Sequence, residues 1–356
     1  MNFRVLSRSD IGVLLGSVVA IAAAAVTRYA GAPAVLAFVV AGVAVALLAS
    51  VVGRSVEQLG DRFGPGATGV LQSALGNLPE LFIGFFALQA GLIAVVQAAI
   101  IGSILSNILL VLGLSFVVGG LRNGPQRFDS GRARTSAILM VLATAALVLP
   151  SLAQYVHTPA APHEKALSLI VSVVLLGVFV LSLPAALKRG PVSGEPAEAE
   201  REGPHWPLWL AVTLLAGASV AAALVSDWFV HALEPAIDAL GISQAFAGLV
   251  IVAIAGNAIE NVVGIQLAYR NKADFAMSVI IQSPLQIALV LAPALVLLSL
   301  LTATTLTLVF APMLVVAVAV TVIAVAFVVF DGESTWLEGV TLIALYAIIA
   351  TAFWWG

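Results

Sequence analysis

Two matching polar motifs lie inside long apolar stretches of this 356-residue chain, and their side chains could bind a cation. The first runs from Gly76 to Glu80 and the second from Gly256 to Glu260, a shift of 180 positions without a gap. Residues of the first copy that are identical in the second include Gly76, Asn77, Glu80, Gly84, Ile100, Ile101 and Ser103. Each copy holds an amide and a carboxylate three residues apart, which places them on one face of a helix. Such paired clusters in apolar segments are typical of a transport site.

The oxygen atoms of these motifs suit a hard cation, because they come from carboxylates, amides and hydroxyls without sulfur or nitrogen donors. Ca²⁺ fits best, since it accepts roughly six to eight oxygen ligands in flexible geometry. Mg²⁺ gives up its water reluctantly, and Na⁺ carries less charge. Pro79 and Pro284 would each interrupt helical hydrogen bonding and leave a carbonyl oxygen near the ion.

Protons are the natural competitors of that cation. Once the ion has left, two buried carboxylates such as Glu80 and Glu260 cannot both stay charged at low cost. Protons would then occupy the empty site. Exchange of one Ca²⁺ for up to two protons on these glutamates is itself an antiport mechanism.

Each polar residue also has a structural interpretation. A single intramembrane Asn or Ser more often joins helices than binds an ion, and one buried Glu can be a protonated hydrogen-bond donor. Two repeat-related glutamates, each with an Asn three residues earlier, favour the functional interpretation. Gln97 has no polar counterpart, because Met277 occupies that position. We expect Gln97 and Gln282 to lie beside the ion ligands or on the path of protons.

The composition predicts an all-α polytopic membrane protein, with 62% hydrophobic residues, 9% charged residues and a mean hydropathy of +1.13. The chain has no cysteine, which excludes disulfides and thiolate metal ligands. Its four histidines fall in or beside predicted loops, so neither a histidine metal centre nor a heme is expected. A phosphate-binding glycine loop is absent from the sequence, which excludes ATP as the driving force. We therefore expect no cofactor and no nucleic-acid partner.

About eleven apolar stretches are long enough to cross a bilayer. They cover residues 11–26, 33–52, 67–90, 92–118, 135–153, 165–187, 208–230, 245–269, 273–300, 304–330 and 337–355. The first resembles a signal peptide, but a second span follows at once, which favours an uncleaved helix. The acidic, Gly- and Pro-rich stretch 189–206 is predicted to be a solvated cytoplasmic linker.

The distribution of positive charge predicts the orientation of these spans. With the N-terminus inside, thirteen of the fifteen Lys and Arg residues lie on the inner side. The positive-inside rule then places the N-terminus in the cytoplasm and the C-terminus outside, in what we expect to be a bacterial plasma membrane. The two motif-bearing spans begin on opposite sides under this orientation. The prediction is one N-terminal helix (1–30) and two inverted five-helix repeats (31–188 and 207–356), with the site near the midplane.

These motifs resemble those of the cation/proton (Ca²⁺/H⁺) exchangers of the Ca²⁺/cation antiporter superfamily. The likeness rests on Gly-Asn-x-x-Glu, then Gln-Ala-x-x-x-Gly-Ser-x-x-Ser-Asn, with a second Gly-Asn-Ala-x-Glu copy, and it extends over nearly the whole chain. It implies the same inverted architecture, and it implies that Glu80 and Glu260 bind both the ion and the counter-transported protons. Further positions that the resemblance assigns to the site are Asn77, Ser103, Ser106, Asn257, Ser283 and Gln286.

Departures from the family pattern bear on selectivity more than on mechanism. Many members have His after the second Glu, where this chain has Asn261, and the usual Gly-Ser of the second repeat is Gln282-Ser283 here. The leading hypothesis is export of cytoplasmic Ca²⁺ in exchange for protons. Alternatives are Na⁺ or K⁺ exchange for H⁺, Na⁺-driven Ca²⁺ exchange, a cation channel and, least favoured, an intramembrane enzyme. The sequence leaves open whether the chain forms a homo-oligomer.

Overall fold

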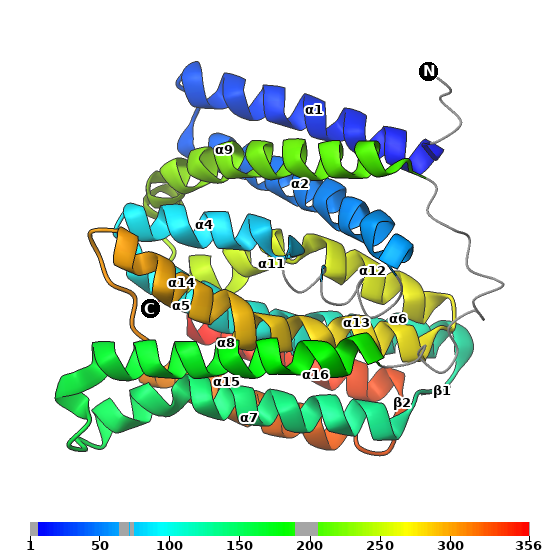
Figure 1. Ribbon diagram of the computed structural model, residues 1–356, viewed down its shortest axis with the longest axis vertical. Coiled ribbons are helices and arrows are strands. Elements are labelled where there is room, and N and C mark those ends of the chain that lie inside the picture. The colour runs from blue at the N-terminus through cyan, green and yellow to red at the C-terminus, as the bar shows by residue number, and fades with distance from the viewer. Residues whose placement is uncertain (1–5, 64–70, 72–74, 189–205, 356) are drawn as a thin grey trace. The chain divides into compact units, whose positions relative to one another are not determined.

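In the part of the chain that the structure describes, the regular elements are helices and one short two-stranded ribbon (Figure 1). The computed structural model describes residues 6–63, 71, 75–188 and 206–355. The predicted all-α membrane fold is confirmed, and each of the eleven predicted apolar stretches overlaps a described helix or run of helices. The predicted linker falls outside the described residues except for Trp206, and so does most of the start of the third span.

The regular elements follow one another along the chain. The α-helices are α1 (Arg8–Tyr29), α2 (Ala34–Phe63), α4 (Leu78–Gln89), α5 (Ile93–Leu105), α6 (Leu112–Asn123), α7 (Ser130–Tyr155), α8 (Glu164–Lys188), α9 (Leu208–Leu240), α10 (Gln244–Phe246), α11 (Ala253–Gly256), α12 (Ala258–Tyr269), α13 (Ala273–Gln286), α14 (Ala292–Leu298), α15 (Pro312–Val328) and α16 (Trp336–Ala352). Three π-helical segments, η2 (Ser106–Val111), η5 (Ala247–Val252) and η6 (Ile287–Leu291), and two 3-10 turns, η3 (Ala161–His163) and η7 (Ser299–Leu301), join them. The strands β1 (Gln126–Arg127) and β2 (Glu333–Ser334) pair antiparallel.

Seven of the described helical stretches are long and apolar enough to cross a membrane, and an eighth is formed by the bent α10–α12 run. The shorter apolar helices α4, α15 and α16 match the remaining predicted spans. Several boundaries differ from the prediction, since α2 ends at Phe63 and α9 at Leu240, beyond the predicted ends at residues 52 and 230. The tenth span was expected to begin at residue 304, but α15 begins at Pro312 and residues 302–311 are not helical.

The chain divides into two compact units by its contacts. Unit 1 comprises the described residues within Met1–Ala90, Leu181–Pro191 and Pro196–Gly241, and unit 2 comprises most of the remainder. In unit 1, α2 packs between α1 and α9, and α4 packs against α9. Phe38 of α2 stacks on Phe229 of α9 with ring centroids 4.6 Å apart. Unit 1 therefore contains the helix that begins just after Asn77.

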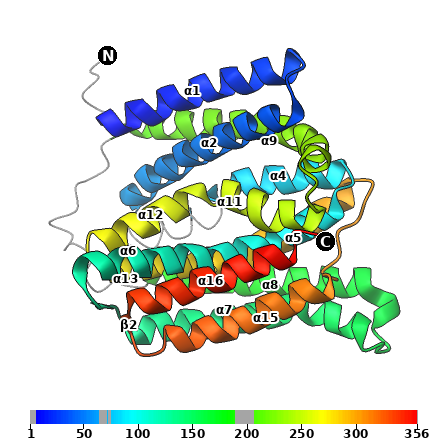
Figure 2. The ribbon, with the colours of Figure 1, turned by 180° about the vertical axis from the view of Figure 1, so that it is seen from behind.

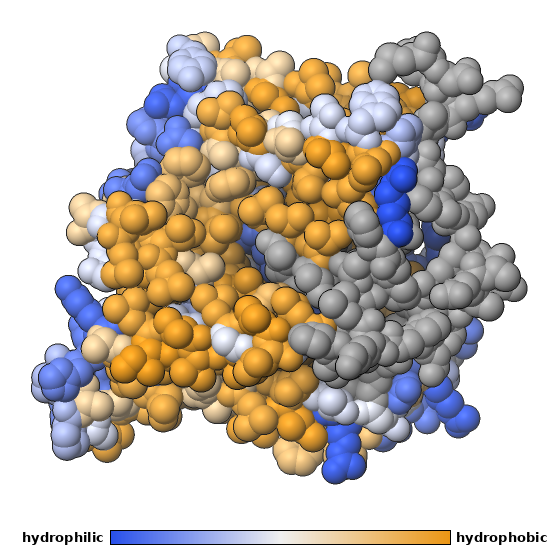
Figure 3. Space-filling model, viewed as in Figure 1, coloured by the Kyte–Doolittle hydropathy of each residue, from blue (hydrophilic) through white to orange (hydrophobic). Residues whose placement is uncertain are grey.

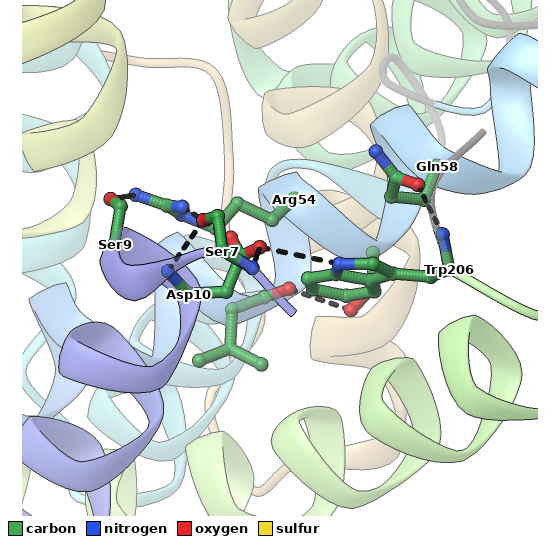
Figure 4. Close-up of polar contacts among 8 residues, drawn as sticks. Ser7, Ser9, Asp10, Arg54, Gln58 and Trp206 are labelled. Atoms are coloured by element: carbon green, nitrogen blue, oxygen red, sulfur yellow. Dashed lines mark hydrogen bonds and ion pairs between the residues drawn. The ribbon is translucent and has the colours of Figure 1, made fainter. Parts of the chain in front are cut away.

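A cluster of polar contacts in unit 1 joins the start of α1 to α2 and to the residues before α9 (Figure 4). Arg54 Nη1 pairs with Asp10 Oδ1 at 2.6 Å, and Trp206 Nε1 donates to Asp10 Oδ2 at 3.3 Å. Gln58 Oε1 accepts from the Trp206 backbone N–H at 3.0 Å. Ser7 caps α1 by accepting a hydrogen bond from the Asp10 N–H. These contacts fix the point at which the chain enters α9.

Unit 2 contains the rest of the motif residues and depends on glycines where its helices cross. A Cβ on Gly102 of α5 would lie 2.2 Å from the Leu249 carbonyl oxygen, and a Cβ on Gly248 would lie 2.3 Å from the Val95 carbonyl oxygen. Glycine therefore lets α5 and η5 approach through their backbones. In the same unit α16 packs along α6 and α15 along α7 (Figure 2).

Two helical runs of unit 2, α5–α6 and α13–α14, lie antiparallel. Gln97, near the start of α5, donates to the carbonyl of Thr307, which follows α14. Gln126, which follows α6, donates to the carbonyl of Ala268 at the end of α12, shortly before α13 begins. The α5–α6 run and the α13–α14 run therefore point in opposite directions, as inverted repeats require.

The outer surface of unit 2 is apolar where α7 and α8 lie (Figure 3). Large exposed side chains on these helices include Ile138, Leu142, Leu149, Ile170, Val173 and Val178. An apolar surface of this kind is expected where helices face lipid.

Candidate functional site

Four polar side chains of unit 2 form one buried hydrogen-bonded cluster: Ser103, Asn107, Asn257 and Ser283. None of them is more than 3% exposed. Ser103 and Asn107 come from the consecutive segments α5 and η2, whereas Asn257 and Ser283 come from the α11–α12 junction and α13. Asn107 and Asn257 are 150 positions apart in the sequence. The structure thus brings together residues of both motif copies.

Asn257 is at the centre of this cluster and uses its whole amide. Its Nδ2 donates to Ser103 Oγ at 3.0 Å and to the Ala253 carbonyl at 2.9 Å. Its Oδ1 accepts from Asn107 Nδ2 at 3.0 Å and from Ser283 Oγ at 3.3 Å. A fully paired amide in a buried site holds its neighbours in defined positions.

Asn107 completes the cluster and is the member that the repeat comparison missed. Its Nδ2 lies 2.9 Å from the Ser103 carbonyl oxygen and 3.2 Å from Ser283 Oγ, besides its bond to Asn257. Because these neighbours accept, Nδ2 faces them and Oδ1 points away, buried and without a hydrogen-bond partner in the part of the chain described. The repeat position of Asn107 is Ile287, so identity between the copies could not identify it. Its place directly after Ser106 in the motif was the available signal.

Ser106 and Gln286 occupy equivalent positions of the two copies and are both buried. Ser106 Oγ donates to the Ser103 carbonyl at 3.3 Å. A π-helical segment begins at or just after each residue, η2 at Ser106 and η6 at Ile287. Such segments shift the backbone hydrogen-bond pattern and are frequent at functional sites. Their recurrence at matching positions extends the repeat from side chains to backbone.

The α11–α12 junction is bent at Asn257, and the helical axes on its two sides differ by 61°. Asn257 has φ −90° and ψ 18°, outside the helical region, and α12 begins at the next residue. In unit 1, Asn77 has φ −91° and ψ 18° and directly precedes α4. Each asparagine therefore directly precedes a helix and places its glutamate in the first turn of that helix.

Asn77 and Glu80 belong to unit 1, where Asn77 is buried and Glu80 is partly buried. The sequence suggested that Pro79 interrupts a helix, but the structure places Pro79 at the start of one. It stands at the second position of α4, where the backbone N–H has no acceptor within the helix, so proline is tolerated there. Pro284 lies inside α13, as predicted.

The remaining candidates differ in their surroundings. The Glu260 side chain lies outside the described residues, although the backbone places Glu260 in the first turn of α12. Gln282 is exposed on α13. Gln97 Nε2 donates to the carbonyls of Thr307 and Val309, at 3.0 Å and 2.8 Å. The structure therefore does not bring Gln97 or Gln282 into the hydrogen-bonded cluster.

The described cluster offers only neutral oxygen atoms to a cation. Amide and hydroxyl oxygens are suitable ligands for Ca²⁺, but a divalent ion also needs negative charge nearby. The carboxylates of the motif, Glu80 and Glu260, are the groups that could supply it. The arrangement fits reversible binding of a hard cation, and nothing in it suggests covalent catalysis.

Comparison with known proteins decides the family. Residues 33–188 and 209–355 match the model of the sodium/calcium exchanger protein family. A Ca²⁺/H⁺ antiporter of Synechocystis is 38% identical over 336 residues, which cover 89% of this chain and 90% of the relative. The chain belongs to the Ca²⁺/H⁺ antiporter family. It is thus an integral membrane protein of a transporter family and not an enzyme.

Other members of the Ca²⁺/H⁺ antiporter family agree in sequence and fold. The Ca²⁺/H⁺ antiporter ChaA of Bacillus subtilis is 37% identical over 325 residues, covering 90% of this chain and 92% of the relative. The solved structure of native YfkE has a TM-score of 0.82 with this chain at 32% identity, covering 96% of this chain and 99% of YfkE. The fold expected from the resemblance is therefore that of this antiporter family.

Proposed function

We propose that the protein exports cytoplasmic Ca²⁺ in exchange for protons. Family membership supports the class of transport, and two curated relatives with this activity in their names are 37–38% identical to the chain. The observation that carries the proposal is the matched pair Asn77–Glu80 and Asn257–Glu260, with the same backbone break at each asparagine. A pair of equivalent carboxylates can hold one divalent cation or accept protons in its place.

In this proposal Glu80 and Glu260 bind both Ca²⁺ and the exchanged protons. Asn77, Ser103, Ser106, Asn257, Ser283 and Gln286 contribute or position neutral oxygens, as predicted. We add Asn107, because its buried Oδ1 is not used by the protein residues described around it. Loss of Ca²⁺ and gain of protons then occur on the same carboxylates, which couples the two fluxes without a separate proton site.

The predicted orientation assigns direction to the exchange. With the N-terminus in the cytoplasm, protons entering the cell from outside would drive Ca²⁺ out across a bacterial plasma membrane. The inverted repeat gives such a protein two related conformations, each open to one side. The halves 31–188 and 207–356 are the proposed repeats, and the stretch 189–206 is their proposed linker.

The alternative is exchange of Na⁺ or K⁺ for H⁺ on the same fold, and the experiment must distinguish it from Ca²⁺/H⁺ exchange. We expect protons and not Na⁺ as the counter-ion, because each motif copy carries a single acidic residue. The test is ion flux into liposomes that contain the purified protein under an imposed pH gradient. Uphill Ca²⁺ movement supports the proposal, and gradient-driven Na⁺ or K⁺ movement without Ca²⁺ would overturn its substrate.

A further inference from the structure

Between η7 and α15 the chain runs through unit 2 as an extended segment, residues 302–311 (Figure 1). Its side chains alternate in burial: Leu306, Leu308 and Phe310 are at most 1% exposed, whereas Thr307 and Val309 are less buried. This period of two is that of a β-strand. No described strand pairs with it, so its buried backbone groups must find partners among side chains.

One edge of the extended segment is held by hydroxyl groups of α7 and α8. Ser151 Oγ donates to the Leu308 carbonyl and accepts from the Phe310 N–H, each at 2.9 Å. Ser168 Oγ accepts from the Leu308 N–H at 2.9 Å, and Tyr155 Oη donates to the Phe310 carbonyl. The segment is therefore fixed to two helices that carry none of the candidate ion ligands.

The other edge of the extended segment is held by Gln97 of α5. The Gln97 Nε2 donates to the carbonyls of Thr307 and Val309, the residues whose backbone groups point away from α7 and α8. The two hydrogens of the Gln97 side-chain amide are thus donated to two carbonyls on the same edge of the extended segment. A hydroxyl could donate only once, and the Met277 of the other repeat could not donate at all. The amide is required by the extended segment, which explains why the repeats differ at this position.

Gln97 and the buried cluster are connected through α5. Ser103 lies six residues after Gln97 on the same helix, which corresponds to about 9 Å along the axis. The Ser103 hydroxyl accepts from Asn257, and its carbonyl accepts from Asn107. Since η2 continues α5 directly, a displacement of α5 along its axis would carry Ser103 and Asn107 with it and disturb their hydrogen bonds to Asn257.

We propose that Gln97 is a positioning residue, which ties α5 to the extended segment 302–311 and thereby holds Ser103 in place for the transported cation. This inference rests on the proposed function for the identity of the cation. It gives Gln97 a role through the backbone of 302–311 instead of direct contact with the ion or its protons. By thermodynamic reciprocity, Ca²⁺ binding must stabilise the extended segment to the same degree that the segment favours Ca²⁺ binding.

The test compares wild type with Gln97→Met, the residue of the other repeat, in liposomes that contain the purified full chain. We expect the KM for Ca²⁺ to rise roughly fivefold or more, the low end of coupling between sites, with a smaller change in maximal rate. Gln89→Met, at an exposed glutamine of α4, is the matched control and should leave the KM unchanged. An unchanged KM in well-folded Gln97→Met would overturn the inference, because a purely structural role predicts less folded protein with normal affinity.

Hydrogen exchange on wild type keeps the test decisive if Gln97→Met fails to fold. Peptides covering 302–311 should exchange several-fold more slowly with saturating Ca²⁺ than without it. Equal exchange in a wild type that transports Ca²⁺ would overturn the inference. A wild type that does not transport Ca²⁺ would instead overturn the proposed function. In that case hydrogen exchange of residues 302–311 that is faster in Gln97→Met than in wild type would still support the role of Gln97 in holding this segment. Equal exchange in the two proteins would contradict it.

Discussion

Asn77 and Asn257 share one backbone conformation, with φ −91° and −90° and ψ 18° in both. Each lies in a different unit, and each directly precedes a twelve-residue helix, α4 or α12. The glutamate three residues later is in the first turn of that helix in both copies. The repeat therefore preserves a non-helical backbone conformation before the helix together with the residue types around it.

Replacing Asn107 by the Ile of the equivalent repeat position should weaken the buried cluster. Asn107→Ile removes the donor shared by the Ser103 carbonyl, Asn257 Oδ1 and Ser283 Oγ. We expect a loss of about 1–2 kcal/mol in folding free energy and a clear fall in Ca²⁺ affinity. Unfolding in detergent and Ca²⁺ flux in liposomes measure the two effects.

Ser115→Ala on α6 is the control for that substitution. Ser115 Oγ is buried without a hydrogen-bond partner in the described structure, so its removal should cost little. Equal destabilisation by Asn107→Ile and Ser115→Ala would show that the cluster contributes nothing specific.

The glycine crossing of α5 and η5 should not tolerate a methyl group. A Cβ on Gly102 would lie 2.2 Å from the Leu249 carbonyl, so Gly102→Ala must push the two helices apart. We expect a cost of about 1–3 kcal/mol and lower transport, since Ser103 is the next residue. Gly217→Ala on α9 has open space around its Cβ and should be neutral or slightly stabilising. Melting temperatures of both variants in one detergent test this, and matching values would refute it.

The ion pair that joins α1 to α2 in unit 1 should contribute measurably to stability. Arg54 and Asp10 are 33% and 13% exposed, so Arg54→Met leaves a largely buried carboxylate without its cation. We expect the free energy of unfolding to fall by about 1–2 kcal/mol, a figure that already allows for partial screening of the ion pair by solvent. The control is Arg127→Met, because Arg127 lies 3.9 Å from Glu333 and is 85% exposed. The melting temperature should fall in Arg54→Met and not in Arg127→Met. An equal fall in both variants would contradict a stabilising role for the Arg54–Asp10 pair.

The sequence predicted the motif cluster because both copies keep their polar residues in register. Ser103, Asn257 and Ser283 were found by identity under a fixed shift, and the structure joins them by hydrogen bonds. Asn107 escaped this criterion, since an inverted repeat brings unlike residues together at its centre as readily as like ones. Hydrogen-bond partners across a repeat are set by proximity, and proximity is not visible in a comparison of equivalent positions.

Hydropathy could not distinguish the extended segment 302–311 from the start of a span. Leu306, Leu308 and Phe310 are apolar and buried, as they would be in a helix. The signals for a strand were their alternation and Pro312, which begins α15 because proline suits a first helical position. Ser151 and Ser168 lie in the predicted spans 135–153 and 165–187, and their role is visible only when the backbone they bind is located.

The most direct test of the account is Ca²⁺ uptake into liposomes against its gradient, driven by an imposed pH difference, for wild type, Glu80→Gln and Glu260→Gln. Glutamine keeps the shape of each side chain but removes the charge and the exchangeable proton. The account predicts uphill uptake by wild type and its loss in both variants, while Gln89→Met stays active. Proton-driven uptake that survives either Glu80→Gln or Glu260→Gln, or downhill flux indifferent to the pH difference, would contradict it.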